Sequence, residues 1–204
     1  MSRQHLLALL VAMLLVPVMH GCRSTPETVH YRLDLDVDQV EQTESDRPAL
    51  ALEQLSVDAA YDETQIAYRS SPYKLERYYY HRWAAPPGLL LTDAMREAYS
   101  ATGRFRSVTS GSVARSDMVL SGQVVALEEI DVTDEEWQGR IVLELRLRDA
   151  VTGDLLWSET IEKRRDLDDR SPAGLAAALS ESIGDVVEET SAEFVEVYRR
   201  RIAD

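Results

Sequence analysis

Two alternating segments and one long amphipathic stripe constrain the fold of this chain most strongly. Apolar and polar residues alternate through Arg140–Asp149, the stretch "AVTGD" forms a tight turn, and Leu155–Arg164 returns as the partner strand. Ser171 and Pro172 then begin a helix whose apolar residues recur every three or four positions. Over roughly thirty residues this helix is about 45 Å long. The hairpin and the helix each present one apolar face, and we expect these faces to pack together.

Six further strands and one further helix are predicted upstream. The helix begins at "PPG" (Pro86–Gly88) and ends at Gly103. The order strands, helix, strands, helix predicts a single α+β domain, in which two helices cover one face of a mixed, mainly antiparallel sheet. The predicted upstream strands are Val29–Val37, Ala49–Val57, Gln65–Arg69, Tyr73–Tyr79, Phe105–Val108 and Asp117–Val132.

The first residues of the chain have the pattern of a lipoprotein signal peptide. An apolar run over Leu6–Val18 follows Arg3, and it is too short to span a bilayer as a stable helix. Gly21 precedes Cys22, which is the only cysteine of the chain and so excludes an internal disulfide. We therefore predict that the leader is cut before Cys22 and that the Cys22 thiol is acylated.

This interpretation divides the chain into a signal peptide (1–21), a lipidated tether (22–28) and one domain (29–204). Two or more acyl chains give stable membrane anchoring. Arg23 follows the cysteine. In a Gram-negative cell an aspartate at that place favours retention in the inner membrane, so Arg23 predicts the periplasmic face of the outer membrane.

Charge and reactive groups exclude several classes of function. The formal charge of −14 argues against nucleic acid as a partner, because phosphate binding needs a basic surface. His30 lies at a polar position of its strand, and His81 lies in an aromatic segment without a nucleophile pattern nearby. The aspartates of "DLDD" (Asp166–Asp169) lack the glycine and the later glutamate of a calcium loop. We predict no catalytic residue, no metal site and no cofactor.

The segment Ile66–Gly88, "IAYRSSPYKLERYYYHRWAAPPG", gathers most of the tyrosines of the chain, with cations between them. Its order of motifs is Tyr-Arg, Pro-Tyr, three consecutive tyrosines, Arg-Trp and Pro-Pro. This segment resembles the signature of the ABC-type transport auxiliary lipoproteins. The early "YRL", the later "LSGQV" and "DAVTGDLLWS", and the helix start "SPAGLAAALS" also fit, so the resemblance covers nearly the whole mature chain.

The resemblance implies a periplasm-facing lipoprotein that accompanies an ABC transporter with a mammalian-cell-entry (MCE) type lipid-binding subunit. Such a transporter moves phospholipid or another hydrophobic molecule between membranes. This chain would dock the tunnel-forming subunit to the outer membrane or receive cargo from it, and it would assemble as a homo-oligomeric ring. Two alternatives stay open: an independent envelope-assembly lipoprotein, which would have other partners, and an enzyme, which would need a cleft with converging polar groups.

Interface chemistry selects the candidate partner-binding residues. Tyrosine, tryptophan and arginine supply much of the binding energy at protein interfaces. We predict that Tyr68, Tyr79, Arg82 and Trp83 contact the partner, and we expect Tyr73 to point inward with the other residues of its strand face. The alternative for Tyr68 and Trp83 is that their rings close the core between the hairpin and the first helix.

Overall fold

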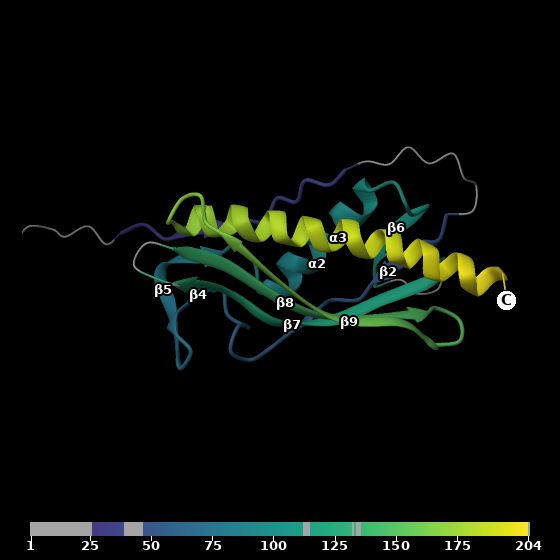
Figure 1. Cartoon of the computed structure of the whole chain (residues 1–204), viewed down its shortest axis with the longest axis horizontal. Helices are drawn as coiled ribbons and strands as arrows, with labels where there is room; N and C mark the ends of the chain where they lie inside the picture. The colour runs from purple at the N-terminus through teal and green to yellow at the C-terminus, as the bar shows by residue number, and fades with distance from the viewer. Residues whose placement is uncertain (1–25, 39–46, 112–114, 132, 134–135, 204) are drawn as a thin grey trace, which may run out of the picture.

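The computed structural model describes residues 26–38, 47–111, 115–131, 133 and 136–203. Within these residues nine strands form one sheet, and helices α2 (Pro87–Ala101) and α3 (Pro172–Ala203) lie on one of its faces. The long α3 crosses the sheet from one end of the molecule to the other (Figure 1). The predicted α+β fold with a mixed sheet and a long C-terminal helix is confirmed. Neither described helix has an apolar stretch long enough to cross a membrane.

Three long strands form the body of the sheet as an antiparallel meander. Strand β7 (Met118–Asp131) pairs with β8 (Trp137–Asp149), and β8 pairs with β9 (Leu155–Asp166). In β8 and β9 apolar and polar residues alternate, as the sequence predicted. Strand β8 begins earlier than the predicted Arg140, at Trp137, which pairs with Asp131.

The aromatic segment forms the hairpin of β4 (Gln65–Ser71) and β5 (Lys74–Trp83). This pair is antiparallel, with register shifts near both of its ends. Strand β4 also joins the edge of β7 in parallel over Ala67–Arg69. The hairpin therefore continues the long sheet at one end of the molecule.

The four remaining strands are short and pair in parallel, and the bounds of the three strands predicted for these segments need correction. Strand β1 contains only Val29–Tyr31, and β6 is Ser107–Ser110, two residues later than predicted. The predicted strand Ala49–Val57 is divided into β2 (Ala49–Leu52) and β3 (Ser56–Val57). The break lies where the Leu55 amide donates to Thr92 Oγ1 of α2 at 2.9 Å instead of to a strand.

The expected strand over 29–37 ends early because its backbone bonds to α3. The Asp34 amide donates to Ser180 Oγ (3.1 Å), and the Asp38 amide donates to Glu188 Oε1 (2.9 Å). The apolar side chains of this segment, Leu33 among them, still pack on the main core. Alternation predicted the buried face correctly but predicted the wrong backbone partner.

The main core lies between the sheet and the two helices. Its largest fully buried side chains are Trp83, Tyr99 and Phe194, and the rings of Tyr99 and Phe194 stack with centroids 6.0 Å apart. Gly122 allows β7 to lie close to β8, since a Cβ atom at this position would lie 2.3 Å from the Glu144 carbonyl oxygen. Gly139 leaves room for α3, whose Leu175 lies 3.3 Å from the place of its Cβ.

Candidate partner-docking site

The β4–β5 hairpin contains all four residues that the sequence singled out as partner-binding. Tyr79 is 71% exposed and its ring meets Tyr80 edge-on, with centroids 4.7 Å apart. Arg82 is half-buried and donates from Nη1 to Thr64 Oγ1 at 3.2 Å. Tyr68 is half-buried and packs on Tyr78 with a centroid distance of 4.8 Å. Tyr79 is thus the most accessible of the four predicted partner residues.

Trp83 occupies the core instead of the surface. Its side chain is 2% exposed and belongs to the main hydrophobic cluster. Its amide donates to the Thr64 carbonyl at 2.7 Å, at the end of β5. The core alternative therefore describes Trp83, and we remove this residue from the candidate surface.

Tyr73 also differs from its predicted position. We expected it to point inward, but it is 97% exposed at the tip of the β4–β5 hairpin. The prediction treated Tyr73 as the first residue of a strand, but β5 begins at Lys74 and Tyr73 belongs to the turn. Tyr78, further along β5, is half-buried and donates its hydroxyl to Glu129 Oε1 at 2.7 Å.

An aromatic chain links the hairpin to β1. The Tyr31 hydroxyl and His81 Nδ1 lie 2.9 Å apart, and the His81 ring meets Tyr78 edge-on with centroids 5.6 Å apart. Tyr78 in turn contacts Tyr68. Burial raises the pKa of Tyr31, Tyr68 and Tyr78 above that of a free phenol, so these rings remain neutral hydrogen-bonding groups.

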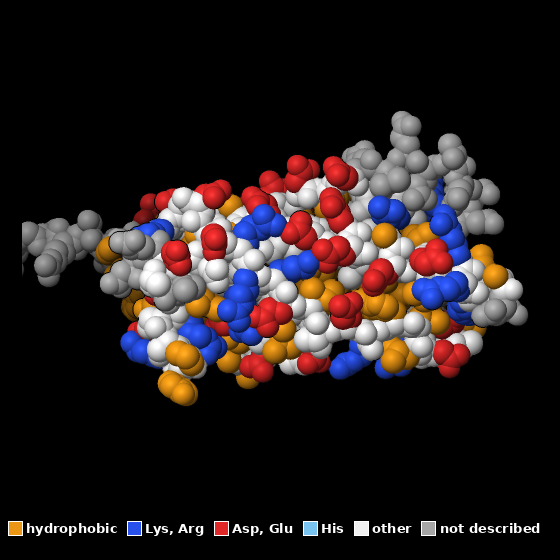
Figure 2. Space-filling model, viewed as in Figure 1, with side chains coloured by type: hydrophobic (Ala, Val, Ile, Leu, Met, Phe, Trp, Pro, Cys, Tyr) orange, Lys and Arg blue, Asp and Glu red, His pale blue; other side chains and the backbone are white. Residues whose placement is uncertain are grey.

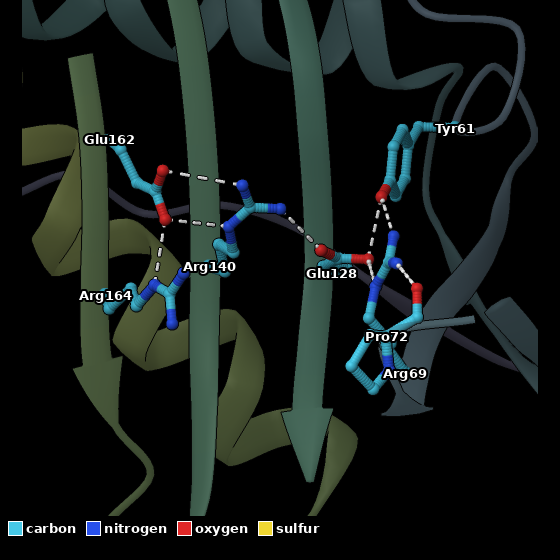
Figure 3. Close-up of polar contacts among 7 residues, drawn as sticks. All are labelled: Tyr61, Arg69, Pro72, Glu128, Arg140, Glu162 and Arg164. Atoms are coloured by element: carbon cyan, nitrogen blue, oxygen red, sulfur yellow. Dashed lines mark hydrogen bonds and ion pairs between the residues drawn. The ribbon is translucent and has the colours of Figure 1, made fainter. Parts of the chain in front are cut away.

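On the opposite face of the sheet, a buried carboxylate holds the hairpin to the long strands (Figure 3). Glu128 of β7 is fully buried. Its Oε2 accepts from the Tyr61 hydroxyl (2.7 Å) and from Arg69 Nε (3.1 Å), and its Oε1 accepts from Arg140 Nη1 (2.8 Å). Three donors, two of them cationic, offset the cost of burying this charge.

The network continues across two further strands. Arg140 Nε donates to Glu162 Oε1 at 2.9 Å, and Arg164 Nε donates to the same oxygen at 2.8 Å (Figure 3). Hydrogen bonds from these two guanidinium groups lower the pKa of Glu162 to about 2. The resulting ladder, Arg69–Glu128–Arg140–Glu162–Arg164, links β4, β7, β8 and β9 and fixes their relative positions.

The same network orients the hairpin tip. Arg69 Nη1 donates to the Pro72 carbonyl at 3.0 Å, and Arg69 Nη2 donates to the Tyr61 hydroxyl at 2.9 Å (Figure 3). A cavity of about 430 Å³ adjoins this tip and is lined by Arg69, Ser70, Ser71, Pro72, Glu128, Ile130, Asp131, Arg140 and Arg164. Most guanidinium donors at its wall are already bonded within the ladder, so the arginines act as supports of the tip.

The neighbouring residue Glu129 faces the helices and is also fully buried. Burial raises its pKa to about 7, even though the Tyr78 hydroxyl donates to it. Asp131 lies two residues further on the same strand, and burial raises its pKa as well. Glu129 Oε2 and Asp131 Oδ1 are buried and accept no hydrogen bond from the described residues, and a proton on Glu129 would supply the missing donor.

The sequence contains one sign of the two buried carboxylates, which is a pair of consecutive glutamates inside an otherwise apolar strand. In "VVALEEID", residues 128 and 129 occupy opposite faces of β7, and each face is covered. A charge on a buried face needs a partner. The sequence does not identify those partners, because Arg69 and Arg140 lie far from Glu128 along the chain.

The candidate reactive groups that the sequence offered have structural partners or face solvent in the described part of the chain. His30 is exposed, and His81 is bonded to Tyr31. Within the described part of the chain, no group of three or more histidine, cysteine or acidic residues is placed to hold a metal ion. In "DLDD", Asp166 Oδ1 accepts from Gln138 and Asp169 Oδ2 accepts from Ser171.

A family model described as ABC-type transport auxiliary lipoprotein component matches residues 31–190. This match covers the hairpin, the long sheet and most of α3. The chain belongs to this family. It is thus a member of a lipoprotein family associated with ABC transport systems in the cell envelope.

Solved structures share the fold at low sequence identity. Protein XCC0632 from Xanthomonas campestris is 20% identical with a TM-score of 0.77, over 87% of this chain and 100% of that one. A structure described only as an uncharacterized protein is 16% identical with a TM-score of 0.66, over 83% and 99%. The hypothetical protein CT253 from Chlamydia trachomatis is 5% identical with a TM-score of 0.50, over 72% and 96%. No curated protein matches the chain.

Proposed function

We propose that this protein is a periplasm-facing, outer-membrane lipoprotein that serves as the docking subunit of an MCE-type ABC transporter. The transporter would move phospholipid or another hydrophobic molecule between the membranes. The family match over residues 31–190 carries this proposal. The protein acts through binding and positioning, and it catalyses no reaction of its own.

The exposed part of β5 is the surface that we propose for the MCE-type subunit. Tyr79 presents an accessible ring, Arg82 presents a half-buried guanidinium group, and half-buried Tyr68 of β4 packs on Tyr78 of β5. An aromatic side chain can bury a large area at low entropic cost, and arginine adds hydrogen bonds. The charged ladder behind the hairpin holds this surface rigid, which reduces the ordering cost of docking. We further propose that the protein assembles as a homo-oligomeric ring.

Replacing Tyr79 with serine should weaken binding of the periplasmic domain of the MCE-type subunit by roughly tenfold to thirtyfold, because a central aromatic contact contributes about 2 kcal/mol. Surface plasmon resonance with the immobilised subunit measures the Kd. Val151→Ser is the matched control, since Val151 is 86% exposed in the β8–β9 turn, away from β5. Equal Kd values for the two variants and the wild type would remove Tyr79 from the docking surface.

Replacing Cys22 with alanine should release the protein from the membrane fraction, because the acyl chains supply the anchor. Mass spectrometry of the purified wild type should show the added diacylglycerol at Cys22, and fractionation should move the variant into the soluble periplasmic fraction. A wild type without this mass, or a processed variant that still sediments with membranes, would contradict the lipid anchor.

A further inference from the structure

The β4–β5 tip, defined here as Ser70–Lys74, is the most protruding part of the hairpin. All five of its residues are exposed, and Tyr73 is 97% exposed. The tip is nevertheless held in place, because Arg69 Nη1 donates to the Pro72 carbonyl and Ser70 Oγ donates to Glu76 Oε2. A fully exposed aromatic ring is therefore presented on a fixed support.

Strand pairing places the tether at the same end of the molecule as this tip. Strand β1 runs parallel to β5, with Val29 opposite His81. The chain before Val29 therefore leaves along β5 toward its start. In Figure 1 the described N-terminal segment emerges at the end that holds β4 and β5, and the C-terminus of α3 lies at the other end.

Covalent reach allows the acylated cysteine and the tip to meet one membrane surface. Cys22 and Val29 are seven residues apart, which corresponds to at most about 25 Å of extended chain. His81 and Lys74 are also seven residues apart, which corresponds to about 23 Å along a strand. A tether of this length can follow β5 back to the hairpin tip, and it is too short to cross to the far end of a helix about 48 Å long.

The tip also has the chemistry of a membrane interface. Tyrosine is favoured at the headgroup level, because its ring is apolar and its hydroxyl is polar. From Ser70 to Lys74 the tip contains no acidic side chain, although the whole chain carries a charge of −14. The next acidic residue is Glu76, and Lys74 Nζ pairs with it at 2.7 Å. The surface around α3, in contrast, shows many acidic side chains (Figure 2), which an anionic bilayer would repel.

We propose that the β4–β5 tip lies in the headgroup region of the bilayer that holds the acyl anchor, with Tyr73 as its deepest side chain. This inference rests on the proposed acylation of Cys22. The tip and the acyl anchor are then two separate contacts with the bilayer. Two contacts fix the orientation of the domain, whereas the anchor alone would leave it free to rotate. The β8–β9 turn and the C-terminal end of α3 then point away from this membrane.

A spin label on the tip tests this orientation. Because Cys22 is acylated, Tyr73→Cys introduces the one free thiol of the mature chain. The acylated variant is reconstituted into vesicles of phosphatidylethanolamine with a minor fraction of phosphatidylglycerol, and paramagnetic relaxation is measured with oxygen and with a water-soluble nickel complex. We expect the label at position 73 to lose most of its nickel accessibility on vesicles and to gain oxygen accessibility.

Val151→Cys is the matched control, because Val151 is 86% exposed in the turn between β8 and β9. Its label should keep the same nickel accessibility with and without vesicles. If both labels stay open to nickel while the protein floats with the vesicles, the tip inference is wrong and the anchor stands. If the wild type does not float with vesicles, the anchor itself fails. If only the MCE-type subunit shields position 73, the tip is a protein contact and the inference is overturned.

Discussion

Replacing Arg140 with methionine should lower the free energy of unfolding by about 3 kcal/mol, because it leaves buried Glu128 with one cationic partner fewer. Arg140 is the central support of the ladder, since it bonds Glu128 through Nη1 and Glu162 through Nε. Methionine retains much of the apolar stem and so limits the loss of packing. In a domain of this size the expected fall in Tm is about 6–12 °C.

The matched control for this prediction is Arg164→Met. Among the described residues Arg164 bonds only the outer carboxylate Glu162, and its side chain is 53% exposed. An exposed ion pair of this kind contributes about 0–1 kcal/mol. Urea unfolding followed by circular dichroism measures both variants. If both variants lost a similar amount of unfolding free energy, the stabilisation by Arg140 would not depend on its bond to buried Glu128.

The ladder links stability to the proposed function. Arg69 belongs to it through Glu128 and also holds the tip through the Pro72 carbonyl. Loss of Arg140 should therefore loosen the hairpin before the rest of the sheet, because Glu128 is shared by both arginines. Hydrogen exchange of the β4 and β5 amides should increase more in Arg140→Met than exchange of the β8–β9 amides.

The fold was largely predictable from the sequence for those segments in which alternating side chains belong to a strand that is also paired in the sheet. In β8 and β9 one face lies under the helices, so alternation marks both the strand and its buried side. The agreement fails over residues 32–37, which alternate and yet bond to α3. A side-chain pattern reports burial, and it contains no information on which backbone group accepts each amide.

The candidate site was less predictable because turns and long-range pairs decide it. Tyr79 is exposed as a docking residue requires, but Trp83 is in the core and Tyr73 is at a tip. All three are aromatic residues in one short segment, so composition alone cannot separate them. The difference arises from the register of β5 against β4, which shifts near both of its ends. Glu128 and Glu129 were visible as anomalies, but their partners come from distant strands.

The second large effect that we expect is a loss of stability as the pH rises from about 5 to about 8, caused by Glu129. Its folded-state pKa is about 7, against an ordinary value of 4.5. Between these values the folded state holds a proton that the unfolded state has released, so the free energy of unfolding falls as the pH rises. The contribution is fully present below about pH 4.5 and is lost as the pH passes through 7. We expect it to amount to about 2 kcal/mol.

The groups around Glu129 explain why the neutral acid is favoured. The Tyr78 hydroxyl donates to Oε1 and Asp131 lies on the same strand. Across the sheet, Tyr68 of β4 and Gly139 of β8 are its register partners, and Leu175 of α3 packs above Gly139. None of these five residues brings a cation, so ionised Glu129 would lie beside another carboxylate with only a phenol to stabilise it.

Glu129→Gln tests this assignment, because an amide has nearly the shape of the protonated carboxyl group and keeps a donor for Asp131. The variant should be about 2 kcal/mol more stable than the wild type at pH 8 and of similar stability at pH 4.5, as measured by urea unfolding across this range.

Glu162→Gln is the control, because the pKa of Glu162 is shifted in the opposite direction. Arg140 and Arg164 lower the pKa of Glu162 to about 2, so its contribution is lost only as the pH falls toward that value, and the slope between pH 5 and pH 8 should remain. A wild-type slope that persists unchanged in Glu129→Gln would mean that another group titrates there, and that the pair of Glu129 and Asp131 is already ionised in the folded protein.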